Sequence, residues 1–150
     1  MIINNTCAGM TVKEYLLNIK KLKRAIRLKQ EEIEELRTLA TSITVKTGEE
    51  PVQTSGTSDK VGNIVAKIVD LQRDMEDSMI EYLKQRAECV KLLEQMQEVD
   101  EREVLYRRYV QDMKWEEVAQ AMGYSNTYVR GTLHDTAIIN FENLIHNSTD

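Results

Sequence analysis

The chain has 150 residues, a formal net charge of −5, 41% hydrophobic residues and 30% charged ones. This composition supports one or two small cores. The acidic balance argues against a protein that coats polyanions nonspecifically, but it does not exclude a local DNA-binding face. No apolar run is long enough to cross a membrane, and residues 1–9 lack the basic start and apolar centre of a signal peptide. We therefore expect a cytoplasmic protein.

Residues that could carry catalysis or hold a metal are sparse. Two cysteines, Cys7 and Cys89, and two histidines do not make a usual zinc site, so both thiols are interpreted as reduced bystanders. The sequence has no glycine-rich phosphate loop and no combination of nucleophile, base and acid. We expect no cofactor and no enzymatic activity.

One proline, six glycines and 5% aromatic residues predict an all-α fold. Residues 1–10 are interpreted as a disordered leader, after which Thr11 and Glu14 have the spacing of a capping box that opens a helix. Apolar residues then recur in the three-and-four steps of a heptad, which only Lys29 breaks. The positions of this first seam are Val12, Tyr15, Ile19, Leu22, Ile26, Ile33, Leu36, Ala40 and Ile43.

Residues 44–60 lose this periodicity and gather Gly, Pro, Ser and Thr, which predicts a flexible loop. A second heptad follows, with Ser58 or Thr57 as its expected N-cap. The positions of this second seam are Val61, Ile64, Ile68, Leu71, Met75, Ser78, Tyr82, Gln85, Cys89, Leu92, Met96 and Val99. Residues 11–99 are thus predicted to form a long antiparallel helical hairpin or coiled coil. Its two seams pair within one chain or between two chains, and we expect a homodimer through them.

The charges of the two segments support their pairing. Residues 12–43 carry eight Lys and Arg against five Asp and Glu, and residues 61–99 carry five against eight. The basic cluster of the first segment could instead lie on DNA phosphates, but a solvated and salt-bridged helix face is the favoured interpretation. The polar residues Ser78 and Gln85 can set register or oligomeric state.

Residues 100–146 are predicted to form a small helical domain that opens with a capping box at Asp100 and Glu103. Within it, residues 114–133 have the spacing of a helix-turn-helix: Val118, Ala119 and Met122 lie on one face, and Gly123 follows at the helix end. Ser125 is a good N-cap for the next helix, whose buried stripe continues from Val129 and Leu133. The alternative interpretation is that residues 114–133 form an ordinary helical hairpin in the core of some other all-α protein, which has the same pattern.

The motifs VLYRRYV, WEEVAQAMGYS and VRGTLH between Glu103 and Ala137 resemble region 4 of sigma-70-type factors, where such a helix-turn-helix reads promoter DNA. Nearly the whole chain after Met10 resembles a family of small proteins of unknown function that phages and prophages of Gram-positive bacteria encode. These are often grouped with phage late-transcription activators. The resemblance implies a DNA-binding transcription regulator of phage genes in the bacterial cytoplasm, with RNA polymerase as a candidate partner.

This resemblance also implies the site residues. Carried over by position, the residues that would face bases in the major groove are Ser125, Asn126, Thr127, Arg130, Gly131 and His134. Asparagine suits adenine and arginine suits guanine. Arg107, Arg108 and Lys114 would hold phosphates. In the plainer interpretation, Asn126 and Thr127 only support the cap, Arg130 pairs with a carboxylate, and His134 is a surface histidine.

Two features depart from the sigma pattern. Residues 100–150 carry five basic residues against nine acidic ones, so we expect modest DNA affinity. Gly131 lies inside a predicted helix, where it costs about 1 kcal/mol relative to alanine. Either something else holds that helix, or a close approach to a partner requires a residue with no side chain. Two alternatives remain: a protein-interaction module with a degenerate helix-turn-helix, and a DNA-packaging adaptor similar to small terminase subunits, in which the DNA-binding domain usually comes first.

Overall fold

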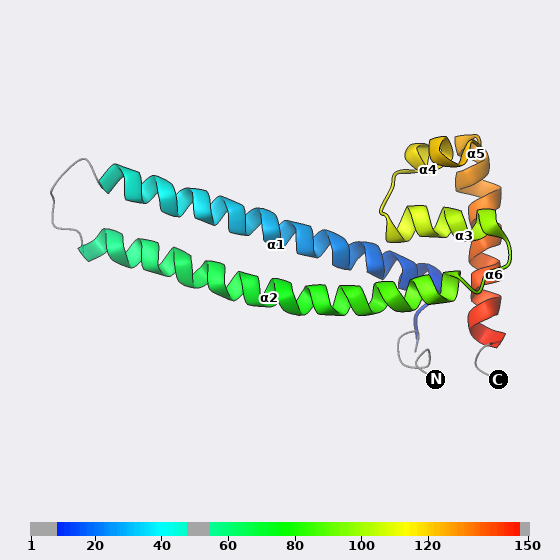
Figure 1. Cartoon of the computed structure of the whole chain (residues 1–150), viewed down its shortest axis with the longest axis horizontal. Coiled ribbons are helices and arrows are strands. Elements are labelled where there is room, and N and C mark those ends of the chain that lie inside the picture. The colour runs from blue at the N-terminus through cyan, green and yellow to red at the C-terminus, as the bar shows by residue number, and fades with distance from the viewer. Residues whose placement is uncertain (1–8, 48–54, 148–150) are drawn as a thin grey trace. The chain divides into compact units, whose positions relative to one another are not determined.

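The structure is a computed structural model that describes residues 9–47 and 55–147. Most of the predicted leader, including Cys7, and the centre of the predicted loop lie outside these residues. The fold is all-α, as predicted, and no strand occurs in the ranges described. Two long helices, α1 (Val12–Thr47) and α2 (Ser55–Leu93), form an N-terminal hairpin (Figure 1).

Shorter helices follow the hairpin. Helix α3 (Val99–Leu105) runs directly into η2 (Tyr106–Val110), a segment with the wider turn of a π-helix. Helix α4 (Trp115–Met122) precedes a continuous helical stretch made of α5 (Asn126–Tyr128), the π-helical η3 (Val129–Leu133) and α6 (His134–Asn147). In the part of the chain that is described, no helix has the length and apolarity to cross a membrane.

The chain divides into two compact units. The hairpin unit comprises residues 22–81, and the terminal unit comprises residues 1–21 together with residues 82–150. Both long helices contribute to both units, so the ends of α1 and α2 that belong to the terminal unit are described with the short helices.

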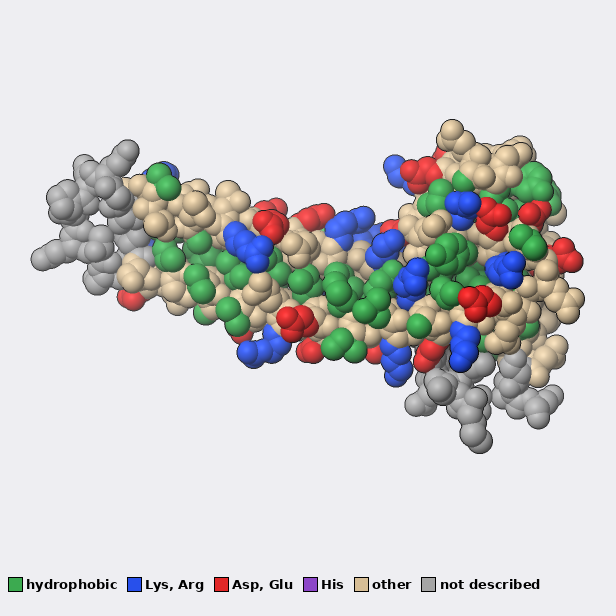
Figure 2. All heavy atoms as spheres, viewed as in Figure 1, with side chains coloured by type: hydrophobic (Ala, Val, Ile, Leu, Met, Phe, Trp, Pro, Cys, Tyr) green, Lys and Arg blue, Asp and Glu red, His purple; other side chains and the backbone are tan. Residues whose placement is uncertain are grey.

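In the hairpin unit the two predicted seams face each other within one chain. Ile33 and Ile68 are 1% and 9% exposed, and the other apolar seam positions between residues 22 and 81 are half-buried. Figure 2 shows apolar side chains between α1 and α2 along the hairpin. The seams that predicted a homodimer are therefore paired inside the chain, and the heptads give that homodimer no support.

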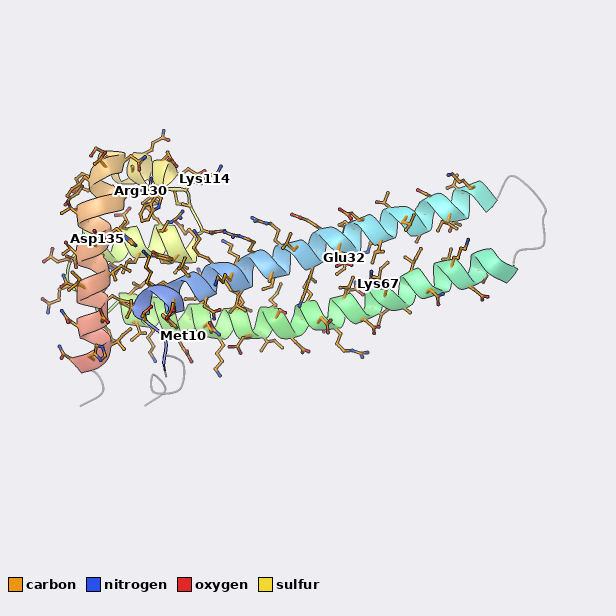
Figure 3. The ribbon with its side chains drawn as sticks, turned by 180° about the vertical axis from the view of Figure 1, so that it is seen from behind. Met10, Glu32, Lys67, Lys114, Arg130 and Asp135 are labelled. Atoms are coloured by element: carbon orange, nitrogen blue, oxygen red, sulfur yellow. The ribbon has the colours of Figure 1, made fainter. Side chains whose placement is uncertain are left out.

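The one polar break in the first seam meets a polar position of the second. Lys29 Nζ donates to Ser78 Oγ at 2.8 Å and lies 3.3 Å from the carbonyl oxygen of Asp74. Beside the seam, Lys67 Nζ lies 3.3 Å from Glu32 Oε1, and Figure 3 shows these two side chains directed toward each other across the hairpin. A hydrogen bond between two seam positions is satisfied in one register of the helices, so Lys29 and Ser78 favour that register.

In the core of the terminal unit, the first turns of α1 and the last turns of α2 pack against the short helices. Asn18 Nδ2 donates to Gln85 Oε1 at 3.0 Å, again a contact between α1 and a polar seam position of α2. The predicted capping box at the start of α1 is confirmed, since Thr11 N donates to Glu14 Oε2 and Glu14 N donates to Thr11 Oγ1. The fully buried side chains of this core include Leu16, Ile19, Cys89, Val104, Leu105, Val118, Val129, Ala137 and Phe141.

Several predicted boundaries differ from those observed. Helix α1 continues to Thr47 and α2 begins at Ser55, so both ends of the loop expected over residues 44–60 are helical, and neither Ser58 nor Thr57 is the N-cap of α2. The second seam was extended too far, because α2 ends at Leu93 and Val99 is 58% exposed at the start of α3. The described residues in these two helix ends are exposed, so burial does not account for the extra turns.

Candidate functional site

The predicted site lies in the terminal unit, on the helical stretch that follows α4. Gly123 ends α4 with φ +73°, a left-handed conformation that glycine adopts without steric cost. The N–H of Tyr124 then donates to the carbonyl oxygen of Ala119 at 3.2 Å, which satisfies a free carbonyl of the helix end. Ser125 Oγ accepts from the N–H of Tyr128 at 3.2 Å and so caps α5. The predicted turn and N-cap are both confirmed.

Buried residues fix which side of the second helix is exposed. Val129 and Leu133 face the core at 0% and 5% exposure, while Val118 and Ala119 of α4 pack into the same core. The small side chain at Ala119 is buried, as the spacing of the motif predicts. The opposite side of α5 and η3 is consequently directed to solvent.

Four residues of that solvent side form one hollow. Asn126, Thr127, Arg130 and Gly131 line an open depression of about 440 Å³ on the surface of the terminal unit. Asn126, Thr127 and Arg130 are exposed, and Gly131 is half-buried. Within the described ranges, none of the three side chains forms a hydrogen bond or an ion pair with the protein. Their donors and acceptors are available to a ligand, and Arg130 pairs with no carboxylate among the residues described.

The prediction that His134 reads a base is wrong. Its side chain is 5% exposed, its Nε2 lies 2.8 Å from Tyr109 Oη, and its ring meets the Trp115 ring edge-on with centroids 4.9 Å apart. The prediction was carried over by position from the resemblance to sigma-70-type factors. Val129, Leu133 and Ala137 form the stripe that faces the core, and His134, next to Leu133, lies at the edge of this stripe, where Tyr109 and Trp115 contact it.

Burial and nearby charges set the protonation of this cluster. Burial lowers the pKa of His134 below its ordinary value of 6.5, and the cations Lys13 and Arg108 act in the same direction, while Asp135 opposes them. Burial also raises the pKa of Tyr109 above its ordinary value of 10.0. At neutral pH the favoured pair is thus a neutral imidazole and a neutral phenol joined by a hydrogen bond.

Two of the three predicted phosphate contacts are engaged inside the protein. Arg107 Nε lies 2.6 Å from Glu103 Oε1 in an ion pair within the α3–η2 stretch. Arg108 Nη1 donates to the carbonyl oxygen of Met113 at 2.7 Å, and its guanidinium lies over the Trp115 ring, 4.6 Å from the ring centroid. These contacts give both arginines a structural role in the terminal unit.

The third predicted phosphate contact, Lys114, is exposed at the start of α4. Only its backbone N–H, which donates to Glu117 Oε2 at 2.7 Å, takes part in capping that helix. Figure 3 labels Lys114 and Arg130, the two exposed cations that flank the turn. Lys114 remains available to an anion.

Sequence reasoning missed a pair of exposed tyrosines beside the hollow. Tyr124 and Tyr128 are 43% and 41% exposed, and their rings meet edge-on with centroids 5.3 Å apart. Tyr124 Oη donates to Asp100 Oδ2 at 2.6 Å, and this hydrogen bond raises the pKa of Tyr124. The aromatic spacing in YSNTY was the available signal. It was overlooked because only the polar residues between the tyrosines were considered as contacts.

Comparison with known proteins gives one match. A family model described as "Protein of unknown function (DUF1492)" matches residues 43–140, which is more than half of the chain and includes the whole α4–η3 region. No curated protein matches the chain. No solved structure matches it either.

Proposed function

The chain belongs to this family of proteins of unknown function (DUF1492), and we propose that it is a DNA-binding transcription regulator that carries no catalytic activity of its own. In this proposal α5 and η3 enter the major groove of duplex DNA. The observation that carries it is the hollow formed by Asn126, Thr127, Arg130 and Gly131, whose polar side chains are exposed and form no hydrogen bond or ion pair with the described residues.

The geometry of the turn supports this proposal. A recognition helix must present residues of its first turns to base edges while its other side is held by the first helix. Ser125 caps α5 at its N-terminus, Asn126 and Arg130 follow one turn apart, and Val129 anchors the opposite side. Asparagine can contact adenine and arginine can contact guanine through paired hydrogen bonds, each worth about 1–3 kcal/mol of discrimination.

The resemblance to region 4 of sigma-70-type factors supports the same assignment and suggests that the regulated genes belong to a phage or prophage. Lys114 is the remaining candidate for a phosphate contact, because Arg107 and Arg108 are engaged by Glu103 and Met113. With few free cations, the proposed interface has modest affinity and needs a second linked contact. We take RNA polymerase as that contact, since the seams expected to form a homodimer pair within the chain.

A binding experiment tests this function. The purified chain is titrated at about 50 mM salt onto fluorescent duplexes from the neighbourhood of its own gene, and anisotropy reports binding. We expect binding that Arg130→Ala removes while the circular dichroism spectrum and the Tm stay unchanged. Arg37→Ala is the matched control, because Arg37 is an exposed arginine of the hairpin unit whose side chain pairs with the neighbouring Glu34. Absence of binding to all duplexes would reject the proposal in favour of a protein-interaction module.

A further inference from the structure

Gly131 has no explanation in the fold. A Cβ added at this position meets no atom within 4 Å, so packing does not require a glycine. Its φ is not in the left-handed region, where only Gly9 and Gly123 are found among the described glycines. Glycine nevertheless weakens a helix relative to alanine, because its backbone loses more freedom on folding. The described protein therefore gives no reason of its own for a glycine at this position.

The position of Gly131 shows where such a partner would approach. Gly131 forms one side of the hollow that Asn126, Thr127 and Arg130 complete. Thr127 and Gly131 are four residues apart, as are Asn126 and Arg130, so the two pairs form neighbouring rows along the helix. One row ends in amide and guanidinium groups. The other row holds Thr127, whose side chain includes a methyl group, and Gly131, which has no side chain.

These two rows match the major-groove edge of an A·T base pair. Thymine presents a C5-methyl group there, and its adenine partner presents the N7 acceptor and the N6 donor. A side-chain amide such as that of Asn126 can bind both adenine atoms. The thymine methyl group needs an apolar surface with room for close approach, which the Thr127–Gly131 row provides.

We propose that the hollow is a thymine-reading subsite, in which the C5-methyl group packs against Thr127 and the backbone of Gly131. This inference rests on the proposed function and adds the identity of the base. It assigns to Gly131 the role of leaving space for the methyl group, and to Asn126 the role of reading the paired adenine.

The test begins with duplexes that the full chain selects from a randomised library. Each thymine of the selected site is then replaced singly by deoxyuridine, which removes only the methyl group. At one position we expect the wild-type affinity to fall about fourfold, the transfer value of one buried methyl group. The Gly131→Ala variant should bind the original duplex more weakly than the wild type. Its affinity should not fall further when deoxyuridine replaces that thymine, because the alanine methyl group occupies the space that the thymine methyl group would fill.

A stability measurement separates this role from a structural one. Gly131→Ala should raise the Tm by about 2–4 °C while it weakens binding, since alanine is the better helix former. Gly62→Ala in α2, where an added Cβ also meets nothing within 4 Å, is the matched control and should raise the Tm without changing binding. Equal affinity for thymine and deoxyuridine at every position overturns the inference but leaves the proposed function standing. Failure to select any duplex overturns the proposed function itself.

Discussion

Lys20 Nζ lies 3.1 Å from Asp112 Oδ1, and their side chains are only 8% and 16% exposed. The pair joins the first turns of α1 to the bend between η2 and α4. Asp112 adopts φ +60° there, a left-handed conformation that aspartate tolerates better than most residues other than glycine. One contact thus ties the hairpin end of the terminal unit to the segment that leads into the proposed DNA-binding helices.

Replacing Asp112 should destabilise the terminal unit. Asp112→Asn keeps the tolerance for positive φ but removes one charged partner of the buried Lys20, so we expect a loss of about 2 kcal/mol in the free energy of unfolding. Urea denaturation measures it. Arg37→Gln, which breaks the exposed pair with Glu34, is the control and should cost at most about 0.5 kcal/mol. If Asp112→Asn also costs no more than about 0.5 kcal/mol, the ion pair with Asp112 does not stabilise the terminal unit.

Stability should fall when the solution becomes mildly acidic. The pKa of His134 is lowered in the folded state, so below pH 6.5 the unfolded chain takes up this proton first and is favoured. The contribution of neutral His134 to the stability of the folded state is fully present above pH 6.5. It is lost as the pH falls through the folded-state pKa of His134. Urea midpoints between pH 7.5 and pH 5 measure this effect.

Two variants assign that pH dependence to one histidine. His134→Gln should flatten the profile between pH 6.5 and pH 5, although the variant is less stable at pH 7.5 because its contact with Tyr109 changes. His146→Gln, at the exposed histidine near the end of α6, should keep the wild-type slope. If instead the slope followed His146, the buried cluster would not be its source.

Lys114 and Arg108 should behave differently when each is changed to alanine. Lys114→Ala removes one free cation, so DNA affinity should fall by a similar factor on all duplexes, and the slope of log K against log salt should decrease in magnitude by about 0.9. Arg108→Ala removes the contacts with Trp115 and Met113, so a fall in Tm is expected. Salt titrations and melting curves of both variants distinguish these roles. If the Tm of Arg108→Ala were unchanged, Arg108 would have no structural role and would again be a candidate for a phosphate contact.

Light scattering of the free protein should give the mass of one chain, 17.4 kDa, across a concentration series. The physical reason is that the heptad seams are already filled within the chain by contacts such as Lys29 to Ser78. A mass of two chains would mean that side chains outside the seams associate, and Ile80, which is 68% exposed in the hairpin unit, would be the first to test. Ile80→Glu should then restore the single-chain mass.

Local motifs of the candidate site were predictable because each depends on neighbouring residues. Gly123 and Ser125 act within one turn of their own helices, and Val129 and Leu133 follow from periodicity. His134 was mispredicted because its position came from the resemblance, whereas its burial depends on Tyr109 and Trp115, which other helical segments bring to it. Arg108 was mispredicted because its partners, Trp115 and the Met113 carbonyl, are fixed by how η2 packs on the next helix.

Helix content, the two apolar seams and the capped turn before Asn126 follow from the amino-acid sequence by itself, since they depend on repeats and caps that act over a few residues. Only the tertiary structure decided that the seams pair inside one chain, that His134 is buried against Tyr109, and that Lys20 meets Asp112. Those outcomes depend on contacts between residues 25 to 92 positions apart, whose geometry no local pattern encodes.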